Sequence, residues 1–252
     1  MTALPIDSSA LLLVLLGGFV AGFTSGFAGF GTGLVASGFW FHALPAAMVP
    51  PLIVVASVAS QAIGFFAVRR AFEWGRATPF LAGGLLGVPV GVMLLARVSP
   101  QLLKLAVGTF LVAYVLASFA RIERWRIGDR GGRAADAVVG VGGGILGGFA
   151  GLSGLLPLVW LQLRGGPSAR QRAVYQPFNF IVLVVACIAM AIAGRFDAEV
   201  VTVCLLCLPA TVIGTVIGTR AYLGIGEQTF QRIVLALLLG SGTALVAQSL
   251  LR

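Results

Sequence analysis

The sequence predicts an all-α polytopic membrane protein made of two inverted repeats, each a glycine-broken helical hairpin followed by three transmembrane helices. Composition is the first observation behind this prediction: the chain is 59% hydrophobic and 10% charged, and its mean hydropathy is +1.04. The second is a set of nearly uncharged stretches of roughly 20 residues, the length that a helix needs to cross the hydrocarbon core. The third is a glycine-rich interruption that occurs twice, at a spacing of 122 residues.

The first apolar segment covers residues 9–42 and is interrupted by GFTSGFAGFG at residues 22–31. Because glycine admits positive φ and lets other groups approach the backbone closely, this interruption predicts a turn between two helical arms, at about 9–25 and 28–42. Such arms are shorter than the membrane core is thick, so we expect some of them to be half-helices that meet near mid-membrane. No Lys or Arg precedes the apolar run, unlike in a secretory signal peptide, and we expect the segment to be retained.

Three membrane-spanning helices follow in the first half, and the second half repeats the pattern. GGFAGLSG at residues 147–154 divides a second broken segment into arms at about 134–150 and 153–163. Each span either carries no charge or carries one near an end. The predicted spans are residues 47–68, 78–96, 101–120, 173–194, 199–219 and 229–250.

Matching glycines and prolines relate the two halves. The tetrapeptide Gly-Phe-Ala-Gly stands at residues 26–29 and again at 148–151. Further pairs at offsets of 126 to 127 are Pro51 with Pro177, Gly87 with Gly214 and Gly91 with Gly218. We interpret the last two pairs as small residues that pack helices together. The predicted domains are a first repeat at residues 1–120, a basic cytoplasmic linker at 121–135 and a second repeat at 136–252.

The net charge of +9 arises largely from basic residues in the short loops 69–76, 121–133 and 164–172. Cytoplasmic loops of membrane proteins collect Lys and Arg, so this distribution indicates membrane topology rather than nucleic-acid binding. If each broken segment turns back as a hairpin, all three loops share one side and the Lys and Arg residues divide 13 against 4. If each crosses once, the division is 10 against 7. Hairpin threading is therefore favoured; it inverts the halves, places the N-terminus outside and puts the three loops in the cytoplasm.

Glycine breaks at corresponding places in two inverted halves are typical of a transporter's substrate site. Irregular backbone inside the bilayer is tolerated only where protein buries it or where it lines a wet cavity, and a half-helix N-terminus there suits an anion. Two kinked helices packed for structural reasons are the alternative. The candidate substrate-binding residues are Gly26, Gly29, Gly31, Thr32 and Gly33 at the first break, Gly148, Gly151, Ser153 and Gly154 at the second, and Gln176 and Asn179 in the span that follows.

Few other polar groups lie inside the predicted spans. Ser57, Ser60 and Gln61 occupy the first-half span that matches the one with Gln176 and Asn179. Hydroxyl and amide groups in hydrocarbon need hydrogen-bond partners. For Ser57 and Ser60 we favour hydrogen bonds to neighbouring helices. For Gln176 and Asn179, such bonds and the lining of a cavity both remain open.

Other kinds of chemistry have few residues available. All eight acidic residues fall in loops or at span ends, so a carboxylate relay inside the membrane is not expected. His42, at the end of a hairpin arm, has either an interfacial or a coupling role. We interpret the three cysteines as small packing residues inside the spans rather than a disulfide or a metal pair: Cys187, Cys204 and Cys207. No metal site, cofactor or enzyme activity is predicted.

The segments GGFVAGFTSGFAGFGTGLV (17–35) and GGGILGGFAGLSGLLPL (142–158) resemble the TauE/SafE sulfite exporter family of membrane permeases. The resemblance extends over about residues 11–250. Thr32 interrupts a stretch that is often all glycine in that family, and Ser153 and Leu155 stand where the first copy has Gly31 and Gly33. The resemblance implies a multi-pass protein of the bacterial inner membrane that carries sulfite, sulfoacetate or related small anions.

Two other kinds of function remain open at this point. One is a five-plus-five-helix exporter of a neutral or zwitterionic metabolite. The other is a non-transporting membrane protein, either an assembly factor or a lipid-processing enzyme, although a lipid enzyme should show clustered Arg, His or Glu at one membrane face in both halves. The expected partners are a small anionic substrate and the lipid bilayer, with no nucleic acid, and the sequence is compatible with a homo-oligomer.

Overall fold

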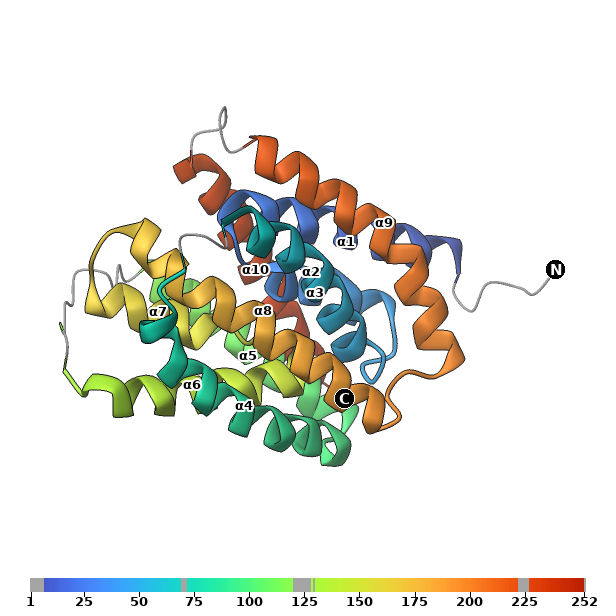
Figure 1. The fold of residues 1–252 in the computed structure, drawn as a ribbon. Helices are drawn as coiled ribbons and strands as arrows, with labels where there is room; N and C mark the ends of the chain where they lie inside the picture. The colour runs from blue at the N-terminus through green and yellow to red at the C-terminus, as the bar shows by residue number, and fades with distance from the viewer. Residues whose placement is uncertain (1–6, 69–71, 120–127, 129, 222–226, 252) are drawn as a thin grey trace.

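The computed structural model describes residues 7–68, 72–119, 128, 130–221 and 227–251. These residues form ten α-helices joined by short connections, and no strand occurs among them (Figure 1). The first half contains α1 (Ser8–Ala28), α2 (Thr32–Ala43), α3 (Val49–Val68), α4 (Trp74–Arg97) and α5 (Pro100–Phe119). The second half contains α6 (Gly132–Ala150), α7 (Leu155–Arg164), α8 (Ser168–Ile192), α9 (Ala198–Ala221) and α10 (Glu227–Leu250).

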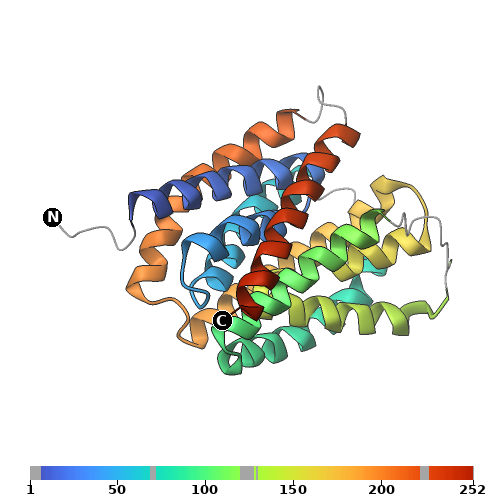
Figure 2. The same ribbon diagram turned by 180° about the vertical axis from the view of Figure 1, so that it is seen from behind.

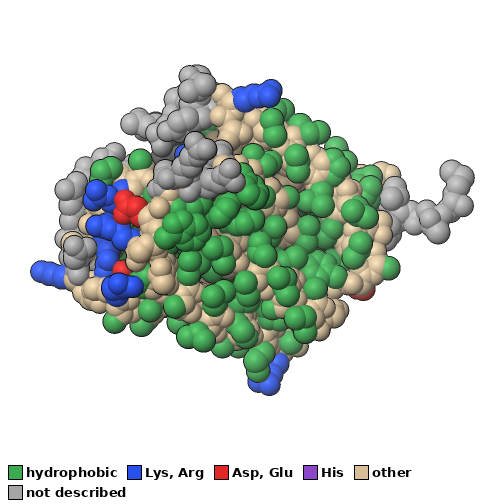
Figure 3. All heavy atoms as spheres, viewed as in Figure 1, with side chains coloured by type: hydrophobic (Ala, Val, Ile, Leu, Met, Phe, Trp, Pro, Cys, Tyr) green, Lys and Arg blue, Asp and Glu red, His purple; other side chains and the backbone are tan. Residues whose placement is uncertain are grey.

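Six helices in the described part of the chain are long and apolar enough to cross a membrane: α1, α3, α4, α5, α8 and α9. Large apolar side chains such as Leu86, Ile192 and Leu205 are exposed on them. Figure 3 shows apolar side chains over most of one face of the molecule, while most of the basic and acidic side chains in view gather at one end. Such a continuous apolar surface is suited to lipid. The predicted fold class, an all-α polytopic membrane protein, is confirmed.

Both glycine-rich segments interrupt the helices at the places that the sequence predicts. α1 ends at Ala28, and Gly29 follows with a φ of 79°, a left-handed conformation that glycine adopts without strain. α6 ends in the same way, with a φ of 72° at Gly151. The helices that follow are short, with 12 residues in α2 and 10 in α7. They measure about 18 and 15 Å, so neither reaches across a membrane core of about 30 Å.

A tryptophan joins the two arms of each hairpin. Trp40, near the end of α2, donates a hydrogen bond from Nε1 to the carbonyl oxygen of Val14 near the start of α1, at 3.0 Å. Trp160 in α7 donates from Nε1 to Oδ1 of Asp136 near the start of α6, at 2.8 Å. Because the second arm returns to the beginning of the first, the chain reverses direction at each break. The two segments are therefore hairpins, while their orientation in the membrane stays a prediction.

Helices of one half pack against helices of the other. α1 packs along α9, and α6 packs along α4, so equivalent helices make equivalent contacts (Figure 1). A Cβ on Gly87 of α4 would overlap the carbonyl oxygen of Val141 in α6, and one on Gly214 of α9 would overlap that of Phe19 in α1. The missing side chains let the backbones touch. The interpretation of these glycines as packing residues is confirmed.

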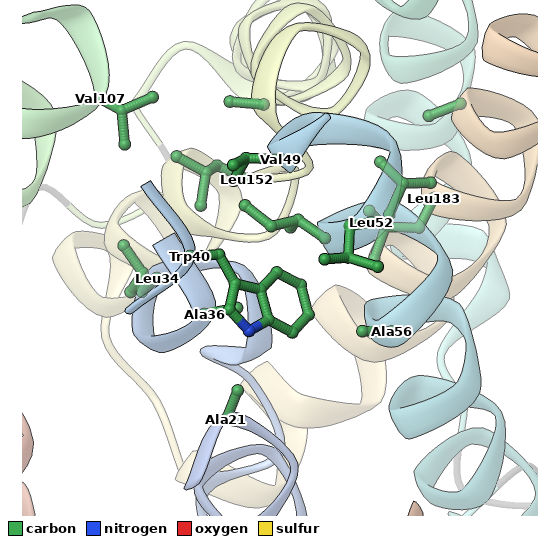
Figure 4. Packing of buried hydrophobic residues seen from close by; sticks show 14 of the residues in the cluster. Ala21, Leu34, Ala36, Trp40, Val49, Leu52, Ala56, Val107, Leu152 and Leu183 are labelled. Atoms are coloured by element: carbon green, nitrogen blue, oxygen red, sulfur yellow. The ribbon is translucent and has the colours of Figure 1, made fainter. Parts of the chain in front are cut away.

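α3 and α8 contact each other in the middle of the molecule, and α5 and α10 pack together on the side that Figure 2 turns toward the viewer. Figure 4 shows the Trp40 indole among side chains of its own hairpin and of α3, with Ala36 and Leu52 close to it. Leu152 of the second break lies in the same cluster, and Trp40 is fully buried. The core is therefore shared by the two halves, and the two breaks come close to each other inside it.

The bounds of the helices in the structure differ from the predicted membrane spans chiefly at α8. This helix begins at Ser168, directly after Pro167, and α7 ends at Arg164, so only residues 165–167 of the predicted basic loop 164–172 are non-helical. A proline just before the first helical turn has no N–H to leave unpaired and has a φ of −63° suited to the turn. The predicted linker 121–135 lies largely outside the described residues, and its last four residues belong to α6.

Candidate functional site

A small cavity lies between the two glycine breaks, with α3 and α8 forming its remaining walls. Its volume is about 20 Å³, room for about one water molecule. The first break and the start of α2 supply Phe30, Gly31, Thr32, Gly33 and Leu34, the second break and the start of α7 supply Gly151, Leu152, Gly154 and Leu155, and the central helices supply Ser57, Gln61, Asn179 and Leu183. Both halves of the chain thus contribute to one site in the interior.

Two helices begin at this cavity. The first backbone hydrogen bond of α2 runs from the Val35 N–H to the Gly31 carbonyl, and that of α7 runs from the Leu158 N–H to the Gly154 carbonyl. Neither Gly31 nor Gly154 has a side chain that could cap the earlier N–H groups, and no side chain of the described residues does so. Uncapped N–H groups and the positive ends of two helix dipoles therefore meet at one place.

Two hydroxyl groups in the cavity wall have no partner. The side chains of Thr32 and Ser57 are each 2% exposed, and Oγ1 of Thr32 and Oγ of Ser57 make no hydrogen bond. Buried polar groups in proteins are nearly always hydrogen-bonded, because an unpaired hydroxyl costs about 1–3 kcal/mol. Two unpaired hydroxyls beside uncapped helix starts indicate a place for a ligand that accepts hydrogen bonds.

Amide side chains complete the polar lining. Ser153 donates its hydroxyl to Oδ1 of Asn179, so the Asn179 carbonyl oxygen is already paired in this arrangement. Its amide nitrogen makes no hydrogen bond to the described residues. Gln61 donates from Nε2 to the Gly29 carbonyl at the end of α1, at 3.3 Å. The cavity consequently presents donors and contains no charged side chain among its lining residues.

Most of the residues expected from the sequence gather at this cavity. Gly31, Thr32, Gly33, Gly151, Gly154 and Asn179 line it. Ser153 is fully buried directly behind Asn179, and the Gly29 carbonyl accepts a hydrogen bond from Gln61, which lines the cavity. These two predicted residues therefore support the wall rather than form it.

The structure places three predicted residues elsewhere. Gly26 packs against the Thr215 carbonyl of α9, and Gly148 packs against the Val88 carbonyl of α4. Both belong to the interhelical glycine contacts, because each lies on the face of its helix that the partner helix covers. Gln176 is buried with its amide nitrogen against Gly64 of α3 and does not line the cavity.

Ser57 and Gln61 are the site residues that the sequence interpretation did not assign. The expected hydrogen bond to another helix exists for Ser60, whose Oγ accepts from Oγ1 of Thr215 at 3.0 Å. For Ser57 the expectation is wrong, because its hydroxyl faces the cavity and has no partner. Ser57 and Gln61 are four residues apart and so share one face of α3, a spacing that could have identified them as a pair.

The basic loops meet at one end of the molecule. Arg76, Arg133, Arg164 and Arg170, one or more from each of the three loops, line a single cavity of about 350 Å³. Within it Nη1 of Arg164 pairs with Oδ2 of Asp136 at 3.1 Å. We call this region the basic end. Hairpin threading requires the three basic loops to lie on the same side of the molecule. The basic residues that the structure describes in these loops lie together, as this threading requires.

The histidine and the three cysteines lie away from the cavity between the glycine breaks. His42 lies within hydrogen-bond distance of Ser241 and Gln248, so it connects α2 to α10. The three cysteines are unpaired thiols in α8 and α9. Among the described residues, no group of His, Cys, Asp and Glu side chains could hold a metal ion.

The chain matches a known protein family along most of its length. A family model described as "Sulfite exporter TauE/SafE" matches residues 14–245, nearly the whole chain. No curated protein and no solved structure matches. The matched range contains both hairpins and every residue that lines the cavity between them.

Proposed function

The chain belongs to the TauE/SafE sulfite exporter family, and we propose that it carries a small sulfur-containing anion, such as sulfite or an organosulfonate, across the inner membrane of a bacterium. The anion binds in the cavity between the two hairpins. The observation that supports this site is the meeting of two uncapped helix starts, at Gly31 and Gly154, in one cavity that is lined mostly by buried residues. Helix N-termini bind anions through free N–H groups and the positive end of the dipole.

The donors of the cavity suit an oxyanion. Sulfite and sulfonates offer three oxygens that accept hydrogen bonds, while the cavity offers backbone N–H groups, the unpaired hydroxyls of Thr32 and Ser57, and the Asn179 amide nitrogen. With no carboxylate in the lining, no charged side chain repels an anion there. With no cation in the lining, the bound anion is not held so tightly that it cannot leave, which a carrier requires.

The walls of the cavity set a limit on its ligand. Leu34, Leu152, Leu155 and Leu183 close it on the apolar side. At about 20 Å³ the space holds about one water molecule, so an anion of four or more heavy atoms needs the hairpin ends to move apart. A site that expands around its ligand fits alternating access, in which one part of a transporter rocks against another.

Anion binding by purified protein tests this proposal. We expect sulfite and sulfoacetate to raise the melting temperature in detergent, and zwitterionic taurine to have a smaller effect. Thr32→Val and Ser57→Ala should each weaken sulfite binding by about 1.5–3 kcal/mol, the range for hydrogen bonds to a charged group. Ser60→Ala is the matched control, because Ser60 lies on the same helix and pairs with Thr215.

The outcomes separate the alternatives. Stronger stabilisation by taurine than by sulfite would favour a zwitterion carrier. An equal effect of Ser57→Ala and Ser60→Ala on sulfite affinity would contradict the assignment of the cavity. Absence of anion flux in proteoliposomes made with the wild-type chain would favour a non-transporting role.

A further inference from the structure

One arginine lies directly beside the first glycine break. Arg172 is in the first turns of α8, and its guanidinium group occupies the space that a side chain on Gly29 would fill. Gly29 has a φ of +79° and ends α1. The glycine thus ends the helix and also gives the guanidinium room against the backbone.

Arg172 has no counter-ion among the described residues. Its Nε is buried without a hydrogen-bond partner, and no described carboxylate pairs with it. Arg170, two residues earlier on the same helix, is different: its Nε pairs with Oε1 of Glu73 at 3.3 Å, and its side chain is 54% exposed. A half-buried cation without a partner is unfavourable, since protein interiors normally pair such charges.

The end of α1 compensates the Arg172 charge only in part. A helix C-terminus carries partial negative charge, which favours a cation close to it. The carbonyl oxygens there have other donors, however: Ala28 accepts from the Tyr175 hydroxyl at 3.5 Å, and Gly29 accepts from Gln61. Arg172 itself makes no hydrogen bond or ion pair to a described residue, so its guanidinium donors are left for a group from outside the described chain.

Phe30 connects this arginine to the cavity. In the chain it lies between Gly29, which contacts Arg172, and Gly31, which lines the cavity. Phe30 itself lines the cavity and packs edge-to-face on Tyr175, with ring centroids 6.3 Å apart. Tyr175 follows Arg172 by three residues, about one helical turn. The contact between the Phe30 and Tyr175 rings thus lies between an anion at Arg172 and the cavity.

We propose that the Arg172 guanidinium, beside Gly29 and next to the Phe30–Tyr175 contact, forms an outer binding site for the transported oxyanion. A guanidinium binds two oxygens of such an anion through parallel N–H donors. The anion binds there first, and it passes into the cavity when the Phe30 and Tyr175 rings move apart. The inference rests on the proposed function and adds a second anion site to it.

Sulfite flux into proteoliposomes, measured together with sulfite binding in detergent, tests this site. We expect Arg172→Gln to lower flux at low sulfite concentration by about tenfold or more, the loss expected for charge-assisted hydrogen bonds. Affinity for the cavity should change by less than about threefold, because Arg172 is not part of its lining. Arg172→Lys should give an intermediate flux, since it keeps the charge and loses the planar donor pair.

Arg170→Gln is the matched control and should transport like the wild type. Equal flux in the wild type and Arg172→Gln would overturn the outer site and leave the proposed function intact. A sulfite affinity reduced by Arg172→Gln as much as by Ser57→Ala would also overturn it, because Arg172 would then act on the cavity. A lowered melting temperature with unchanged flux would show a structural role only. No anion flux in the wild type would overturn both proposals. If Arg172→Gln does not fold, the sulfite flux of Arg172→Lys is compared with that of Arg170→Lys instead. Equal flux in these two variants would overturn the outer site.

Discussion

Gly144 on α6 lies so close to α4 that a Cβ there would overlap the carbonyl oxygen of Gly84. Gly240 on α10 is also inside a helix, yet a Cβ built on it meets no atom within 4 Å. Two glycines in helix interiors therefore differ in what they do. The first lets two backbones touch, and the second only leaves space on an exposed face.

Alanine substitution should separate these two roles. We expect Gly144→Ala to lower the stability of the folded protein by about 1–3 kcal/mol, because the helices must move apart to admit the methyl group. Gly240→Ala should be neutral or stabilising by up to about 1 kcal/mol, the difference in helix propensity. Melting temperatures of the two variants in the same detergent provide the measurement. An equal decrease for both would contradict the packing role of Gly144.

At the scale of single helices, polar contacts connect the two helices of the second hairpin, α6 and α7. Asp136 near the start of α6 is 6% exposed and accepts hydrogen bonds from Trp160 and Arg164 of α7. Arg164 also donates to the Gly132 carbonyl at 2.8 Å and lies over the Trp160 ring. Among the described residues, the first hairpin has at the corresponding place the bond from Trp40 to the Val14 backbone and no ion pair. The polar connection is therefore concentrated in the hairpin at the basic end.

Removal of the Asp136 carboxylate should open that hairpin. Asp136→Ala leaves the Arg164 cation and the Trp160 N–H without their shared acceptor, so we expect a loss on the order of 3 kcal/mol, as for one partner of a largely buried pair. Glu73→Ala is the control, because Glu73 pairs with the exposed Arg76 and Arg170 and exposed pairs contribute about 0–1 kcal/mol. Thermal unfolding of both variants checks the difference. Similar melting temperatures would mean that Asp136 does not hold the hairpin.

The sequence was sufficient to predict the elements but not all of their contacts. Hydropathy and glycine content predicted the long helices and both breaks, because these depend on local properties of the chain. For Ser57 the sequence favours a hydrogen bond to a neighbouring helix, since a serine in an apolar span gives no indication of which neighbour it faces. The sequence predicts Gly26 in the site together with Gly29, because only three-dimensional packing distinguishes a glycine before the break from a glycine at the break. From the sequence Arg172 is one of several basic loop residues, because its contact with Gly29 joins residues that are far apart in the chain.

On the scale of the whole molecule, the arrangement of the basic residues predicts the orientation in the membrane. Arg76, Arg133, Arg164 and Arg170 line one cavity at the basic end. α4 begins beside this cavity and runs to Arg97, so Ser99 lies at the opposite end. Because Lys and Arg accumulate in cytoplasmic loops, we expect the basic end to face the cytoplasm.

Labelling of single cysteines in intact cells tests that orientation. On a background in which Cys187, Cys204 and Cys207 are replaced by alanine, an impermeant thiol reagent added outside should label Ser99→Cys. It should not reach Arg130→Cys or Pro167→Cys until the cells are lysed. Labelling of Pro167→Cys but not of Arg130→Cys from outside would place two basic loops on opposite faces and rule out the inverted arrangement.

The packing of α1 from the first half against α9 from the second half also has a consequence for biosynthesis. The glycine face of α1, which ends at Ala28, is covered by α9, which begins only at Ala198. At about 5–20 residues per second, the ribosome needs roughly 10–35 seconds to supply that partner. During this time Gly22 and Gly26 of the newly inserted α1 face lipid or the insertion machinery instead of α9. A nascent chain that stops before α9 is therefore an unfinished protein with an uncovered helix, which the quality-control proteases of the membrane can recognise.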